Sequence, residues 1–251
     1  MARQLALIGV IFFSAMAVNS RAQQQTVYKQ QLIWYGWFET LQLNERWQIQ
    51  TEIQERHFVN PLAQHQFLVR AHVHRLLGAK GWEASAGFCT FFHNPNRPGT
   101  SPPLTIPELR PHAELAYRHQ HGKAVFDHRF RTEARFFHHT NQSADALEDG
   151  FGFSAFRFRY RIQLLYPLYE KRYTFKLKLS NEYLLQAGGE TGKPAFDQNR
   201  IYAGLTMQFT PQLSFDLGYM YWYQHRAPAS VYSRHILRFT VFHRMKWGKS
   251  A

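Results

Sequence analysis

Arginine side chains recur at every second position along several segments of the chain. Arg157, Arg159 and Arg161 are separated by the bulky residues Phe158 and Tyr160. Side chains two positions apart lie on the same face of a β-strand. Three guanidinium groups on one face can attract anions, as arginine rings do in anion pores, or can form forked hydrogen bonds with carboxylates.

Charged residues with the same spacing form a candidate lumen charge network. If the apolar face of each segment meets lipid, the charged face points into a lumen. The network comprises Glu52, Arg56, Arg70, Glu114, Arg129, Arg131, Glu133, Arg135, Arg157, Arg159, Arg161, Glu182 and Arg200. We expect the four glutamates to pair with arginines of neighbouring strands, because a bare arginine cluster would repel itself. Two interpretations stay open: the pairs fill a small barrel that transports nothing, or the arginine surplus makes an anion-permeable pore.

An enzyme is the competing class of function. Barrel acyl-hydrolases that act on outer-membrane lipid place a serine or histidine at the rim, and this chain has His138 and His139 followed by Ser143 and Asp145. The spacing matches no known nucleophile motif, and histidines beside a polar loop are usually solvated side chains. Catalysis is therefore the less favoured interpretation, and we assign no catalytic residue and no cofactor.

A metal site is a further alternative. His72 and His74 share one strand face, and His112 could approach them from a neighbouring strand. Zinc sites in proteins combine histidine with cysteine or carboxylate ligands, and no such ligand stands at a fixed spacing from this pair. The sequence pattern alone assigns no metal.

The composition indicates a folded protein with a strong positive charge. The 251 residues are 45% hydrophobic, and 30 lysines and arginines against 17 acidic residues give a formal charge of +13. The basic residues alternate with apolar residues in strands and do not cluster beside stacking rings, which disfavours nucleic acid as a partner.

The first 22 residues have the pattern of a secretory signal peptide. Arg3 precedes an apolar run from Leu5 to Val18, and small residues around Ala22 suit a cleavage site. An N-terminal anchor helix is the alternative, but the run is short for a membrane span. We therefore expect export, with one domain over residues 23–251 and a charge near +11 after cleavage, since two basic residues and no acid are removed. Cys89 is the one cysteine, so no disulfide forms within the chain.

Alternation of apolar and polar residues predicts the strands. Seven segments show it clearly and four show it more weakly. The clear segments are 46–56, 66–74, 108–118, 126–136, 156–163, 173–182 and 200–209, and the weaker ones are 31–43, 82–93, 213–224 and 234–244. Most are close to the length with which a tilted strand crosses a bilayer, about 9–11 residues.

The connections predict how these strands are arranged. Short turns with turn-forming residues alternate with longer polar segments at 58–64, 94–107, 138–150, 186–197 and 225–232. This alternation is typical of an outer-membrane barrel, whereas a soluble sandwich or lipocalin-like barrel would line its interior with the apolar face. We predict an all-β, antiparallel up-and-down transmembrane β-barrel of 10–12 strands. Eleven candidates are counted, although bacterial barrels normally have an even number.

The chain resembles a bacterial outer-membrane barrel family known only as family 2490 of the domains of unknown function. The resemblance covers nearly all of residues 23–251. It rests on Trp34 with Trp47, Glu52–Arg56, Glu108–Arg110, Arg129–Arg135, Arg157–Arg161, Asn181–Tyr183 and Gln198–Arg200 in this order. It implies an outer-membrane barrel and supplies no catalytic residues.

The expected location is the outer membrane of a Gram-negative bacterium. The expected partners are outer-membrane lipid and lipopolysaccharide, the barrel-assembly machinery and small anions. Arg97, Lys193 and Arg226 fall in the longer loops, where they could contact lipopolysaccharide phosphates, although ordinary solubility explains them equally well.

Overall fold

The computed structural model describes residues 25–101, 103–188, 195–226 and 230–248, and the expected signal peptide at 1–22 lies outside these ranges. The described residues form eleven β-strands. They are β1 (Thr26–Gln42), β2 (Trp47–Phe58), β3 (Ala63–Leu76), β4 (Trp82–His93), β5 (Ile106–His121), β6 (Ala124–Thr140), β7 (Leu147–Glu170), β8 (Thr174–Ala187), β9 (Ala195–Gln208), β10 (Leu213–Arg226) and β11 (Ser230–Lys246). Each predicted segment overlaps one of these strands. Within the described residues, no helix is long and apolar enough to cross a membrane.

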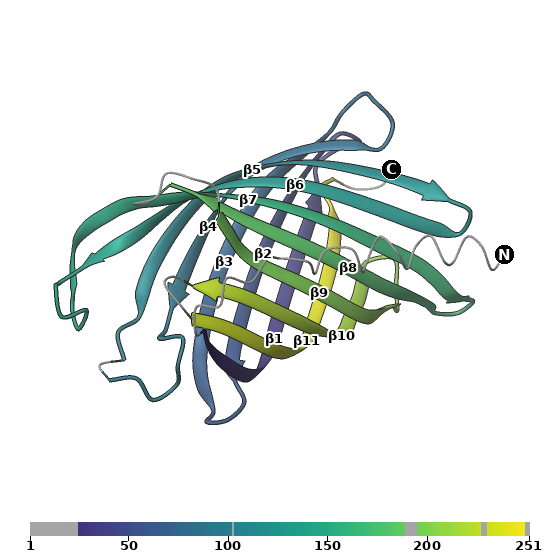
Figure 1. The fold of residues 1–251 in the computed structure, drawn as a ribbon. Helices are drawn as coiled ribbons and strands as arrows, with labels where there is room; N and C mark the ends of the chain where they lie inside the picture. The colour runs from purple at the N-terminus through teal and green to yellow at the C-terminus, as the bar shows by residue number, and fades with distance from the viewer. Residues whose placement is uncertain (1–24, 102, 189–194, 227–229, 249–251) are drawn as a thin grey trace.

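The strands close into one barrel (Figure 1). Each strand pairs antiparallel with its neighbour in sequence, as an up-and-down barrel requires. Because an odd number of alternating strands gives the first and the last the same direction, β1 and β11 pair in parallel, from Thr26 opposite Ser230 to Gln42 opposite Lys246. The predicted fold class and strand range are confirmed, and an odd number is observed.

Turn-forming side chains fix the short connections at one rim. The Oδ1 atom of Asn44 accepts hydrogen bonds from the backbone N–H groups of Arg46 and Trp47, both at 2.9 Å. Gly122 links β5 to β6 with a φ of 59°, a conformation that glycine adopts without steric cost. These turns hold adjacent strands in register.

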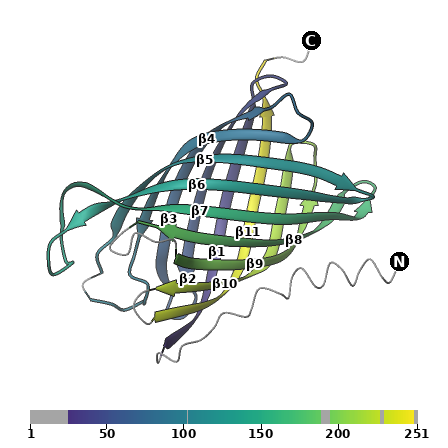
Figure 2. The ribbon, with the colours of Figure 1, turned by 45° about the horizontal axis from the view of Figure 1, so that its top comes forward.

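The β6–β7 hairpin differs from the expected long loop at 138–150. β6 continues to Thr140 and β7 begins at Leu147, so the hairpin extends past the neighbouring strands (Figure 2). Asn141 closes the turn, since its Oδ1 atom accepts a hydrogen bond from the N–H of Asp145 at 3.0 Å. The polar residues that predicted a loop here are compatible with an extended hairpin because residues 142–151 are exposed.

The two faces of the wall differ in polarity. Apolar side chains on the outer face are exposed, including Phe130 at 61% and Leu217 at 54%. Most buried side chains on the inner face are charged or polar. The arrangement is the reverse of a water-soluble barrel, whose apolar residues fill the interior.

An apolar cluster lies inside the barrel beside the charged residues. It lies on β1, β2, β9, β10 and β11 and consists of Leu32, Trp34, Phe58, Tyr202, Met220, Trp222 and Ile236. The strands β1 and β10 carry aromatic residues on both faces, so alternation alone does not show which rings point inward. We call this set the aromatic shelf.

Candidate functional site: the lumen charge network

The thirteen residues of the candidate lumen charge network all point into the barrel. Twelve of them line one internal cavity of about 600 Å³, which runs from the turn at 77–81 toward Gln224 and Arg226. Glu133 is buried in the wall beside the cavity, with 1% of its surface exposed. Each strand of a closed barrel has one face toward the interior, so residues spaced two apart on every strand meet there.

The β2–β6 part of the network consists of short ion pairs. Arg70 approaches Glu52 at 3.0 Å between Nη1 and Oε2. The Nε atom of Arg131 lies 2.8 Å from Oε2 of Glu114, and Nε of Arg129 lies 3.3 Å from the same oxygen. Each pair joins different strands, so the charges hold the register of the wall from inside.

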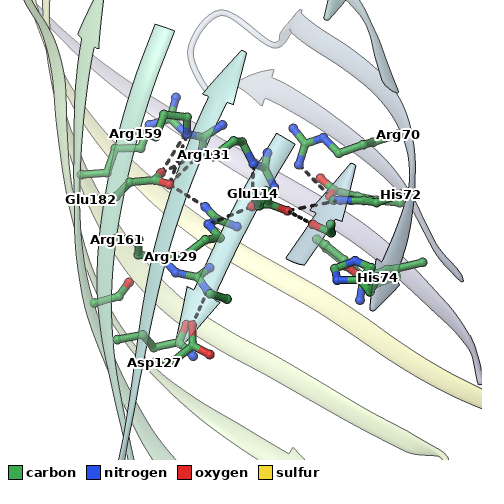
Figure 3. Close-up of a pocket in the computed structure, with 18 of the residues that line it drawn as sticks. Arg70, His72, His74, Glu114, Asp127, Arg129, Arg131, Arg159, Arg161 and Glu182 are labelled. Carbon is green, nitrogen blue, oxygen red and sulfur yellow. Dashed lines mark hydrogen bonds and ion pairs between the residues drawn. The ribbon is translucent and has the colours of Figure 1, made fainter. Parts of the chain in front are cut away.

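A second set of pairs connects β6, β7 and β8 (Figure 3). The guanidinium of Arg159 lies between two carboxylates, 2.7 Å from Oε1 of Glu133 and 2.9 Å from Oε2 of Glu182. Arg129 donates to Glu182 at 2.6 Å and thereby joins this set to Glu114. Charge-assisted contacts of this length are strong where water is excluded.

The triplet on β7 is neutralised by carboxylates. Besides the two partners of Arg159, Arg157 lies 2.8 Å from Asp197 and Arg161 lies 2.9 Å from Asp127. The three guanidinium groups that the sequence singled out for anion binding are thus held in pairs. An anion attracted by them would compete with these carboxylates.

A cluster around Glu108 was absent from the sequence-based candidates. The carboxylate is fully buried and accepts hydrogen bonds from Arg110 and Arg135, with shortest distances of 2.6 Å to each, and lies 2.6 Å from Nε2 of His93. Glu108 and Arg110 share the face of Glu114 at spacing two, so the same alternation could have identified them. A further pair joins Lys178 of the clearly alternating segment 173–182 to Asp216 of the weaker segment 213–224, at 2.7 Å.

Basic groups outnumber acids around the cavity. Among the described residues, fourteen arginines and two lysines line it against five carboxylates. Four more carboxylates contact these bases from the wall, namely Glu108, Glu133, Asp197 and Asp216. Nine acids against sixteen bases leave a positive lumen.

Part of the excess charge lies at the aromatic shelf. Arg56 donates to the amide oxygens of Gln54 and Gln66 at 2.8 and 2.7 Å, and its guanidinium lies 3.9 Å from the ring centre of Trp34. Arg200 donates to Gln198 at 2.6 Å. Arg56 makes no ion pair among the described residues, and Arg200 has a carboxylate partner only at 3.8 Å, so positive charge remains available to a ligand here.

Trp222 and the remaining donors complete the shelf. The guanidinium of Arg200 lies 4.7 Å from the Trp222 ring centre and 3.8 Å from the nearest oxygen of Glu182. Among the described residues, the indole N–H groups of Trp34 and Trp222 have no hydrogen-bond acceptor. Cationic groups therefore face the lumen on this side, beside two buried indole rings.

The loop after β4 folds over the rim and reaches the place where β1 pairs with β11. Asn96 accepts a hydrogen bond from Arg234 at 3.0 Å through Oδ1 and one from Gln30 at 2.7 Å through its backbone carbonyl. Arg97 is exposed and donates to the hydroxyl of Tyr28 at 3.3 Å. Of the other two proposed loop contacts, Arg226 ends β10 beside the cavity, and Lys193 lies outside the described residues.

The candidate catalytic residues lie at the β6–β7 hairpin without the contacts that catalysis needs. Nδ1 of His138 lies 3.1 Å from the backbone carbonyl of His139, and Nδ1 of His139 lies 3.1 Å from that of Asp149. Asp145 is hydrogen-bonded to Asn141, and neither histidine is hydrogen-bonded to Ser143 in the described structure. The contacts of these described residues do not activate Ser143 as a nucleophile.

The histidines considered for a metal site are partly brought together. His72 and His112 meet with ring centres 4.9 Å apart, and Glu114 lies beside them. His74 turns instead to Glu83, with 2.7 Å between Nδ1 and Oε1. Glu114 was assigned only to the charge network, because the spacing in the sequence does not show that two histidines converge on it.

Comparison with known proteins identifies the family. Residues 31–233 match the family described as protein of unknown function (DUF2490). A solved chain titled as a NanC porin in a rhombohedral crystal form is 14% identical and aligns over 85% of this chain and 99% of that chain, with a TM-score of 0.48. A search of curated proteins gave no match. The family match spans most of the sequence, and the chain therefore belongs to the DUF2490 family.

Proposed function

We propose that the protein is a barrel of the bacterial outer membrane. Exposed apolar side chains on the outer wall, such as Phe130, Leu217 and Leu237, support this, because hydrocarbon is the solvent that stabilises them. A closed barrel also pairs its backbone groups around the whole wall, as a membrane span requires. Export through the signal peptide at 1–22, assembly by the barrel-assembly machinery and lipopolysaccharide contact at the loops belong to this proposal.

We infer further that the lumen conducts small anions. The observation that carries this inference is the positive charge at the aromatic shelf, where Arg56 lines the cavity without an ion pair among the described residues and Arg200 has a carboxylate partner only at 3.8 Å. Cationic side chains in a pore favour anions by direct attraction. The arginines of the opposite wall are paired with carboxylates. They stabilise the barrel and contribute less to the electrostatic field in the lumen.

A structural barrel with a closed lumen is the second candidate. The contact of Asn96 with Arg234 favours it, because it holds the loop after β4 across part of the rim. The two candidates differ in a single measurable property, the passage of ions.

The deciding experiment is the reversal potential of the refolded protein in a planar bilayer under a potassium chloride gradient. We expect a stable conductance with a preference for chloride. A charge about 4 Å from a passing chloride stabilises it by roughly 1 kcal/mol in water-like surroundings, so removal of both charges in R56Q/R200Q is expected to lower the chloride-to-potassium permeability ratio at least about thirtyfold.

Two controls make this test specific. R56K/R200K keeps the charge and should keep the anion preference, whereas R172Q removes an exposed charge on the short β7–β8 turn and should leave the ratio unchanged. Absence of conductance from folded protein, or cation preference, would reject the pore. If R56Q/R200Q kept the ion selectivity of the unaltered protein, the residues that select the ion would lie in another part of the lumen.

A further inference from the structure

His72, His112 and Glu114 meet on the inner wall of the barrel at a place where the intervening strand has no side chain. His72 on β3 is opposite Gly87 on β4, and Gly87 is opposite His112 on β5. The strands β3 and β5 are about 10 Å apart, and the imidazole rings of His72 and His112 bridge this distance over Gly87. A Cβ atom on Gly87 would clash with the backbone carbonyl of Ala71 and would lie 3.0 Å from Nε2 of His112, so the strand pairing requires glycine there and leaves space for the ring.

Two of the distances between the potential ligand atoms match those of a metal site. Nε2 of His112 lies 3.3 Å from Nδ1 of His72, and this Nδ1 lies 3.4 Å from Oε1 of Glu114. The three atoms lie within 4.8 Å of one another. Bonds of about 2.0–2.2 Å place neighbouring ligands of a tetrahedral zinc ion roughly 3.3 Å apart.

Neighbouring groups orient two of these ligands. Nδ1 of His112 lies 3.4 Å from the backbone carbonyl of Arg110, and an N–H donated there leaves the lone pair on Nε2 free. The other oxygen of Glu114 is held by Arg131 at 2.8 Å, and Ser85 donates to Oε1 at 3.1 Å. Such outer contacts typically hold the ligands of protein metal sites in place.

We propose that His72, His112 and Glu114 bind a divalent transition-metal ion, for which Zn²⁺ is the best match. The guanidinium groups of Arg70 and Arg131 lie close by, so cations held by charge alone, such as Mg²⁺ and Ca²⁺, are disfavoured. Imidazole nitrogens form coordinate bonds that suit zinc, copper and nickel. His72 and Glu114 line the cavity, so the fourth coordination position opens to the lumen.

The test is a metal titration of the detergent-solubilised full barrel after removal of metal with EDTA. We expect calorimetry to show one Zn²⁺ per chain, and Co²⁺ to develop the visible absorption of a four-coordinate ion. The H72Q and H112Q variants should weaken Zn²⁺ binding at least about tenfold, since each removes one of three ligands. His112 makes no ion pair in the described structure, so H112Q is the cleaner variant.

His74 provides the matched control, because it lies two residues from His72 on the same strand face and binds Glu83. H74Q should bind Zn²⁺ as the unaltered protein does. Failure of the unaltered protein to bind Zn²⁺, a six-coordinate Co²⁺ spectrum, or equal affinity in H112Q would overturn the site. Equal weakening by H74Q and H72Q would also overturn it, since the ion would then lie elsewhere. The Co²⁺ spectrum of the unaltered protein decides the matter even if a variant does not fold.

Discussion

Replacing Glu108 with glutamine is expected to lower the free energy of unfolding by about 3–5 kcal/mol, the cost of leaving buried charges without their partner. The carboxylate is fully buried and joins Arg110, Arg135 and His93 through contacts as short as 2.6 Å. Glutamine has nearly the same shape but no charge, and its amide N–H groups would face guanidinium donors. Two arginines would then repel each other without the anion between them.

Equilibrium unfolding in denaturant, with the barrel in lipid vesicles, measures this effect. E170Q is the matched control, because Glu170 is exposed at the end of β7, and a change within about 0.5 kcal/mol is expected there. If E108Q proved as stable as E170Q, the buried carboxylate would not hold this end of the network. Loss of stability in both variants would indicate an effect of net charge on the whole barrel.

Replacing Trp222 with alanine is expected to lower stability and to raise conductance at the same time. The indole is 2% exposed, packs edge-on against Trp34 with ring centres 5.7 Å apart, and lies beneath Arg200 and Arg234. Removal of a buried tryptophan costs about 3–5 kcal/mol. In the proposed pore it also widens the cavity, because Trp222 is part of its lining.

Single-channel recording of folded protein tests the second half of this prediction. W37A removes an outward-facing indole from β1, which is 46% exposed, and should leave the conductance unchanged. W222L retains part of the packing and serves if W222A does not refold. A conductance in W222L and W222A equal to that of the unaltered protein would show that the aromatic shelf does not narrow the path.

The alternation of residues was sufficient to predict most of the wall. Segments such as 82–93 and 213–224 correspond closely to β4 and β10, and the inward direction of Arg131 or Glu182 follows from the same period of two. This works because one-residue slips would turn every charged side chain to the outer face. Burial against two different environments thus specifies both the face and the register of each strand.

The remaining features depend on contacts between distant parts of the chain. Trp34 and Trp222 stand on strands with rings on both faces, so their packing inside the lumen could not be deduced from alternation. The partners of Arg157 and Arg161, Asp197 and Asp127, depend on how neighbouring strands are registered. The convergence of His72 and His112 over Gly87 likewise requires three aligned strands.

The parallel pairing of β1 with β11 has a consequence for the order of folding. Thr26 pairs with Ser230, so the ring closes through contacts between the two most distant strands, and such non-local contacts form slowly. Until closure, both strands keep an unpaired edge that can recruit a second chain. We expect a chain truncated before β11 to associate through these edges wherever β10 does not close the ring by antiparallel pairing with β1, and size-exclusion chromatography in detergent measures this.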